Sequence, residues 1–100
     1  MLTKENIIHK LREQRTYLAD HYGVKNIGLF GSYAQEQSTQ ASDIDLLIEF
    51  DRPIGLRFVE LGEYLEQLFD RPVDILTPAG MQNIHIDYIA QNIRESIIYV

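Results

Sequence analysis

Apolar residues recur at helical spacing in three stretches of the chain. In the first, within residues 4–22, the apolar positions are mostly three, four or seven residues apart: Ile7, Ile8, Leu11, Leu18 and Tyr22. Thr3 stands at the N-cap position of this stretch, and Gly23 follows its C-terminal end. The second stretch contains Phe58, Leu61, Leu65, Leu68 and Phe69, and the third contains Met81, Ile84, Tyr88, Ile89 and Ile93. The spacing predicts three amphipathic helices.

Alternation of apolar and polar residues over 43–50 predicts a strand. One face of this strand carries Ile44, Leu46, Ile48 and Phe50, and the other carries Asp43, Asp45, Leu47 and Glu49. Shorter strands are predicted over 24–30 and 73–77, and an edge strand over 96–100. In the sequence, the alternating strand lies between the strands over 24–30 and 73–77, so its acidic residues are near the middle of the chain.

The remaining segments connect these elements. We expect a brief helix over 33–36, a polar loop over 37–42 and a turn over 51–55. The order of elements predicts an α/β (α+β) fold, with a small mixed β-sheet of about three to four strands flanked by about four helices. At 100 residues, the chain is expected to form a single domain over 1–100.

Charge and residue composition exclude several classes of function. The nine Lys and Arg residues are scattered and outnumbered by fifteen Asp and Glu, giving a net charge of −6, which argues against direct nucleic-acid binding. The absence of cysteine excludes disulfides, a thiol nucleophile and a cysteine zinc site. No apolar run approaches the roughly 18 residues that a membrane span needs. We therefore expect a soluble cytoplasmic protein with no membrane association.

Asp43 and Asp45 form the first candidate site. Side chains two apart on a strand share a face, with their Cα atoms about 6–7 Å apart, which suits one divalent cation or a close pair of cations. Seven aspartates in 100 residues produce roughly 0.5 such pairs by chance, so spacing alone is poor evidence. However, two ionised carboxylates about 5 Å apart repel by roughly 3 kcal/mol at an effective dielectric constant of about 20. Because a bound cation would relieve this repulsion, the repulsion favours a metal site at Asp43 and Asp45.

Two further features take on meaning beside this pair. Gly31 and Ser32 stand between a predicted strand and a helix, where a glycine allows close approach of a ligand and a hydroxyl can hold a phosphate oxygen. Taken alone, these two residues favour a simple turn with a capping serine over a ligand site. Asp74 lies inside an apolar strand. It is either a solvent-facing residue of an edge strand or a third acid beside the first two. In the second case the cluster would bind Mg²⁺ and take a proton from an attacking hydroxyl.

The chain resembles the minimal nucleotidyltransferase (MNT) domains of the DNA polymerase β superfamily in three segments: residues 31–34 (Gly-Ser-Tyr-Ala), 42–50 (Ser-Asp-Ile-Asp-Leu-Leu-Ile-Glu-Phe) and 73–75 (Val-Asp-Ile). The element order and size agree along nearly the whole chain. This resemblance implies a nucleotidyltransferase fold.

The same resemblance implies a role for each candidate residue. Gly31 and Ser32 would engage the triphosphate of ATP. Asp43 and Asp45 would coordinate Mg²⁺. Asp74 would be the third acid, completing the metal site and activating the acceptor hydroxyl. The expected catalytic and metal-binding residues are therefore these three aspartates.

The resemblance also implies a partner. Stand-alone domains of this kind are often encoded beside a HEPN protein, an all-helical RNase toxin, and act as the antitoxin of a type VII HEPN/MNT toxin–antitoxin pair. Some transfer AMP from ATP to a tyrosine of that toxin. The length of 100 residues leaves no room for an acceptor-binding domain, which independently favours an acceptor supplied by a second protein.

The chain departs from the family at two positions. Many members read Gly-Ser-x-Ala-Arg-Gly, whereas this chain has Gln35 and Glu36 in the last two places. Loss of the arginine removes a positive charge near the expected phosphates, and Glu36 adds a negative one. Two alternatives to protein AMP transfer therefore stay open: a catalytically degenerate module that neutralises a HEPN toxin by binding it, and a nucleotidyltransferase that acts on a small-molecule hydroxyl.

Overall fold

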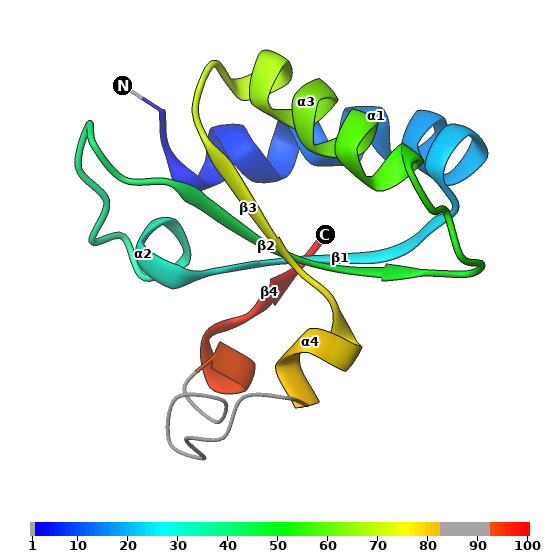
Figure 1. Ribbon diagram of the computed structural model, residues 1–100. Coiled ribbons are helices and arrows are strands. Elements are labelled where there is room, and N and C mark those ends of the chain that lie inside the picture. Colours follow the sequence, from blue (N-terminus) through cyan, green and yellow to red (C-terminus); the bar gives the residue numbers. More distant parts are fainter. Residues whose placement is uncertain (1, 83–92) are drawn as a thin grey trace.

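The computed structural model describes residues 2–82 and 93–100 (Figure 1). Its elements in chain order are α1 (Lys4–Tyr22), β1 (Val24–Phe30), α2 (Gly31–Ala34), β2 (Ile44–Phe50), α3 (Arg57–Phe69), β3 (Val73–Leu76), α4 (Pro78–Gln82) and β4 (Ile98–Tyr99). Residues 93–96 are also helical. The predicted mixed α/β architecture is confirmed.

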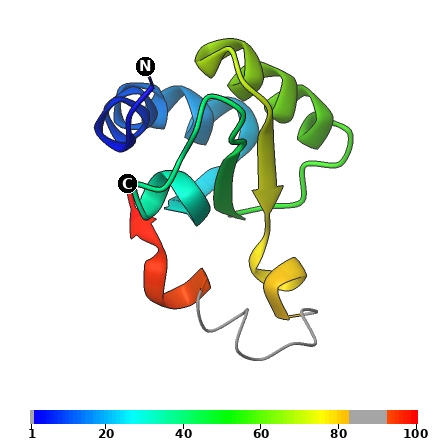
Figure 2. The ribbon, with the colours of Figure 1, turned by 90° about the vertical axis from the view of Figure 1, so that its left-hand side faces the viewer.

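The four strands form one mixed sheet in the order β3-β2-β1-β4. β1 pairs antiparallel with both β2 and β4, whereas β2 and β3 run parallel. Helices α1 and α3 cover one face of this sheet, and α4 and residues 93–96 lie beyond the other (Figures 1 and 2). Since β2 is an inner strand beside β3, the two strands that carry candidate acids are direct neighbours.

The hydrophobic core lies between the sheet and the helices α1 and α3. Its fully buried members include Ile7, Leu11 and Leu18 of α1, Leu61 and Leu65 of α3, and Ile44, Leu46 and Ile48 of β2. Burying such a side chain stabilises the fold by about 1.5–3 kcal/mol. The alternation predicted for β2 is thus confirmed, because its even-numbered apolar residues face the core and Asp45 faces the other way.

Both ends of α1 form as the sequence predicts. Thr3 is the N-cap, and its hydroxyl accepts a hydrogen bond from the Asn6 backbone N–H, while the Asn6 side chain accepts one from the Thr3 backbone N–H. Gly23 ends the helix in the left-handed conformation, with φ of 65°, and its N–H donates to the carbonyl of Ala19. These caps fix the point at which the chain turns into β1.

Several element boundaries differ from the predictions. The short helix begins at Gly31, two residues before the expected start, and β2 begins at Ile44, so Asp43 lies in the preceding loop. The edge strand near the C-terminus is confirmed but spans only Ile98–Tyr99.

The helix predicted around residues 81–93 lies mostly outside the described residues. In the described part of the chain, α4 starts at Pro78, since a proline suits the first helical turn. No helix within residues 2–82 or 93–100 is long and apolar enough to cross a bilayer.

Candidate active site

The register between β2 and β3 places two acids side by side. Asp45 is the partner of Asp74 in the parallel ladder, and neighbouring strands lie about 4.7–4.9 Å apart. Val73 is buried in the core whereas Asp74 is exposed, so Asp74 points to the face opposite α1 and α3, as Asp45 does. Asp74 therefore faces solvent on an edge strand and also lies beside Asp45, so it meets both of the alternatives that the sequence left open.

The central carboxylate, Asp45, is affected by its surroundings. Partial burial raises the pKa of Asp45 above its ordinary value, and the negative charges of Asp74 and Asp43 raise it further. Asp43 itself is exposed at the end of the loop that leads into β2. The site is therefore a patch of crowded negative charge with Asp45 at its centre, and a cation placed there would stabilise the ionised carboxylates.

The donor set fits Mg²⁺ bound together with a phosphate. Carboxylate oxygens are the ligands that Mg²⁺ prefers, and in nucleotide sites the ion is commonly held by one or two carboxylates plus substrate phosphates and waters. Within residues 2–82 and 93–100, no group of three or more acidic or histidine side chains is already arranged to hold a metal ion. The geometry thus suits an ion shared between Asp43, Asp45 and a phosphorylated ligand better than a site closed by protein alone.

Gly31 touches the central acid of the site. Its φ is +76°, in the left-handed region that favours glycine. A Cβ added at this position would lie 3.0 Å from Asp45 Cγ and closer still to Asp45 Oδ2. Phe30, the preceding residue, is the antiparallel ladder partner of Asp45, which explains the contact. Only glycine leaves space for the Asp45 carboxylate here.

Ser32 lies next to this contact in the first turn of α2. Its side chain is half-buried and has no hydrogen-bond partner among the described residues. The backbone of the turn is held instead by the Gln37 N–H, which donates to the Ser32 carbonyl at 2.8 Å. The Ser32 hydroxyl is therefore available for a ligand, close in sequence to the glycine that contacts Asp45.

Glu36 has a partner that the sequence did not indicate. Its carboxylate lies 3.1 Å from the ammonium group of Lys4 on α1, and its φ is +59°. A positive φ agrees with the glycine that the family pattern has at this position. Because the ion pair joins residues 32 positions apart, no local pattern could reveal it. The pair offsets part of the negative charge that Glu36 brings to this end of the molecule.

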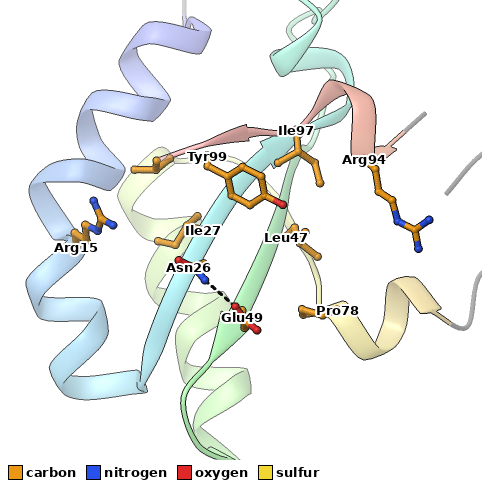
Figure 3. Close-up of a pocket in the computed structure, with 10 residues that line it drawn as sticks. Arg15, Asn26, Ile27, Leu47, Glu49, Pro78, Arg94, Ile97 and Tyr99 are labelled. Atoms are coloured by element: carbon orange, nitrogen blue, oxygen red, sulfur yellow. Dashed lines mark hydrogen bonds between the residues drawn. The ribbon is translucent and has the colours of Figure 1, made fainter. Parts of the chain in front are cut away.

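A pocket of about 710 Å³ lies along the same face of β2, beyond Asp45. Its walls include Leu47 and Glu49 of β2, with Tyr99 on β4 and Arg94 farther out (Figure 3). The Glu49 carboxylate accepts a hydrogen bond from the Asn26 side chain at 2.7 Å. None of the five predicted site residues lines this pocket. Sequence reasoning missed it because the lining residues come from distant segments.

Removing the charge of Asp45 is expected to stabilise the metal-free protein. The raised pKa means that the folded state holds this proton more tightly than the unfolded state, so wild-type stability falls as the pH rises through about 3.9 towards the raised value. Asp45→Asn lacks this loss. Solvent screens a half-buried group, so the gain at neutral pH is less than about 1 kcal/mol, or a Tm increase of up to about 5 °C.

Thermal unfolding in chelator from pH 3 to 8 checks this prediction, with Asp20→Asn on the exposed face of α1 as the matched control. The Tm values of the two asparagine variants should differ only above about pH 4. Equal Tm values for Asp45→Asn and wild type at neutral pH would contradict the crowding of charge at Asp45.

Comparison with known proteins relates this chain to nucleotidyltransferases. The sequence pattern of the nucleotidyltransferase domain family matches residues 11–100. Protein adenylyltransferase MntA of Thermococcus cleftensis is 36% identical over 101 residues, which cover 100% of this chain and 98% of that protein. A solved structure described as a minimal nucleotidyltransferase has a TM-score of 0.74 at 23% identity, covering 97% of this chain and 95% of its own. A chain of a toxin–antitoxin complex with AMP-PNP has a TM-score of 0.63 at 23% identity, covering 98% and 72%.

Proposed function

We propose, from the premise that this chain belongs to the nucleotidyltransferase domain family, that it is a Mg²⁺-dependent protein adenylyltransferase. Its substrate is ATP, and its acceptor is a tyrosine hydroxyl on a partner HEPN RNase toxin, for which the chain acts as the antitoxin. Residues 1–100 form the single catalytic domain. An RNase toxin and ATP are both encountered in the cytoplasm, so we place the protein there.

The observation that carries this proposal is the in-register pairing of Asp45 with Asp74, with Asp43 close enough to raise the pKa of Asp45. A carboxylate cluster of this kind costs stability unless a cation relieves it. Gly31 contacts Asp45 of this cluster, and the next residue in the chain is Ser32, whose hydroxyl has no hydrogen-bond partner among the described residues. A site that binds a divalent ion and a phosphorylated ligand together accounts for all of these features.

Each residue then has a defined task. Asp43 and Asp45 hold Mg²⁺, and the backbone at Gly31 and the hydroxyl of Ser32 bind oxygens of the triphosphate. When bound, the ion supplies positive charge that neutralises the phosphates and orients the α-phosphate for in-line attack. Asp45 is half-buried and central, which suits a ligand, whereas Asp74 is exposed and can meet an acceptor that arrives from outside.

The transfer step balances without any further reactant. Asp74 accepts the proton of the tyrosine hydroxyl as the tyrosine oxygen attacks the α-phosphorus of ATP. The new bond joins the tyrosine oxygen to AMP, the bond between the α-phosphorus and its bridging oxygen breaks, and pyrophosphate leaves. The proton then passes from Asp74 to solvent. Catalysis in this scheme is mainly positioning and charge neutralisation.

The partner assignment is supported by the solved relative that is a toxin–antitoxin complex with AMP-PNP and by the relative named MntA. A partner protein can present its own tyrosine at Asp74, whose side chain is exposed.

One assay tests the function. The protein is incubated with α-labelled ATP, Mg²⁺ and the protein encoded by the neighbouring gene, and the partner is examined by autoradiography and peptide mass spectrometry. We expect one AMP on a partner tyrosine, dependent on Mg²⁺ and absent with Asp43→Asn. A partner that stays unlabelled would contradict the proposed adenylyltransferase activity.

A purely binding antitoxin is the second candidate, and Gln35 and Glu36 favour it because the family's arginine is missing and Glu36 brings a negative charge. In the same assay, a binding module would inhibit the partner RNase without labelling it. The inhibition would be equal for wild type and Asp43→Asn. Labelling and loss of RNase activity that both require Asp43 exclude this candidate.

A further inference from the structure

We propose that Arg71 is a positioning residue that fixes Asp43 for metal binding. The inference rests on the proposed function, in which Asp43 is a Mg²⁺ ligand, and adds a residue that no family pattern singled out in the sequence. Its basis is one hydrogen bond: Arg71 Nη1 donates to the backbone carbonyl of Gln40 at 2.7 Å. This bond joins the entry of β3 to the loop that leads to Asp43.

The loop before β2 is otherwise held only by itself. Ser42 accepts a hydrogen bond from the Thr39 N–H at 2.8 Å and donates its own N–H to the Thr39 carbonyl at 3.1 Å. Among the hydrogen bonds and ion pairs of the described residues, the Arg71 bond is the one that links residues 38–43 to another element. Without it, Asp43 would be anchored by a hydrogen bond only on its C-terminal side, where the Ile44 N–H donates to the Pro72 carbonyl.

The backbone around Arg71 is held in place by several hydrogen bonds. The Glu66 carbonyl at the end of α3 accepts the backbone N–H groups of Asp70 and Arg71, and the Glu66 carboxylate accepts the Val73 N–H at 3.0 Å. From Pro72 onward the chain is tied to β2, because the Pro72 carbonyl accepts the Ile44 N–H at 3.0 Å. The arginine therefore projects from a fixed point, and its half-buried side chain transmits that position to the loop.

The geometry makes this tether relevant to the metal site. Asp43 and Arg71 line the same hollow of about 510 Å³, and the loop and the α3–β3 connection lie at the same end of the sheet (Figures 1 and 2). Asp45 is held by the β2 ladder and Asp74 by β3, but Asp43 precedes β2. It is thus the one acid of the three whose position depends on the loop. A charge-assisted bond from a planar guanidinium is a strong and directional way to hold it.

The test measures Mn²⁺ binding to the full chain by electron paramagnetic resonance, with Mn²⁺ in place of Mg²⁺. The non-hydrolysable ATP analogue AMP-PNP is present throughout, because the proposed site shares its ion with a phosphorylated ligand. Loss of a group that orients a ligand typically weakens metal binding 10- to 100-fold, and we expect about a 10-fold weakening for Arg71→Ala. Arg71→Lys keeps one donor and should recover binding to within about 3-fold of wild type. Arg52→Ala, an exposed arginine in the turn after β2, is the matched control and should bind as wild type does.

A double-mutant cycle separates positioning from general loosening of the fold. If Arg71 acts through Asp43, Arg71→Ala should change Mn²⁺ affinity by less than about 2-fold once Asp43→Asn is present. Tm values for all variants show whether they are folded. The proposal would be overturned by an Arg71→Ala variant that has a lower Tm but binds Mn²⁺ normally. It would also be overturned if the losses of Mn²⁺ affinity added fully in the double mutant.

The role of Arg71 can fail while the proposed function stands. Wild-type protein that binds Mn²⁺ and transfers AMP, together with Arg71→Ala that binds Mn²⁺ equally well, overturns the role of Arg71 alone. Wild-type protein that binds no Mn²⁺ in the presence of AMP-PNP overturns the metal site and, with it, both proposals.

Discussion

Asp45→Asn is expected to lower kcat/KM for AMP transfer at least about 1,000-fold, a loss of roughly 4 kcal/mol of transition-state stabilisation. Asp45 is the central acid of the cluster, between Asp43 in the chain and Asp74 in the sheet. Asparagine keeps the shape but removes the charge that holds a cation. Steady-state rates of labelled AMP transfer to the partner protein provide the measurement.

The same substitution separates catalysis from stability. Asp45→Asn should unfold at a higher temperature than wild type in chelator at neutral pH, because it removes a charge whose partial burial and repulsion by Asp74 and Asp43 raise the pKa of Asp45. The lost rate then cannot be attributed to unfolding. Asp20→Asn, an exposed aspartate of α1, controls for the change of residue type and should retain activity within about 2-fold. An Asp45→Asn enzyme within about 10-fold of wild type would contradict the proposed metal site.

Local patterns predicted the elements that depend on near neighbours in the chain. The helical stripe of α1 and its caps at Thr3 and Gly23 involve contacts within one turn, and both are confirmed. The alternation in β2 depends only on which face is buried, so it placed Asp45 away from the core correctly. For the same reason the sequence could propose the carboxylate pair.

Features that depend on distant segments could not be predicted in this way. Whether Asp74 meets Asp45 is decided by the parallel register of β2 with β3, and the connection between these strands passes through the whole of α3. The Lys4–Glu36 ion pair and the Arg71–Gln40 hydrogen bond likewise join segments about 30 residues apart. The register places Asp74 beside Asp45, whereas the role of Asp74 as the third acid comes from the family resemblance and stays a prediction.

The start of α2 shows a third kind of limit. The sequence predicted helix from Tyr33, because Gly31 and Ser32 read as a turn. In the structure the helix begins at Gly31 itself, whose φ of +76° no other residue type adopts readily. Glycine here is required by the approach of Asp45 as well as by the backbone. This double requirement makes Gly31 a sensitive point of the site.

Gly31→Ala is therefore expected to reduce AMP transfer at least about 100-fold, since a shift of about 1 Å in a positioned group can cost that much. The new Cβ would overlap Asp45 Oδ2, so the Asp45 carboxylate must move from its place beside Asp74. The strained φ adds about 1–2 kcal/mol of destabilisation. Transfer rates and Tm are measured on the same preparations.

Two other glycines separate these causes. Gly55→Ala meets a φ of +57° with no atom within 4 Å of the added Cβ, so it carries the backbone strain without the overlap. Gly62→Ala lies in α3 with equally open space and should raise stability by about 0.5–1 kcal/mol, as alanine does in helices. We expect both controls to keep wild-type transfer rates while Gly31→Ala loses activity. If Gly31→Ala and Gly55→Ala lose the same stability and both remain active, the contact between Gly31 and Asp45 has no part in catalysis, and the nucleotide must be held elsewhere.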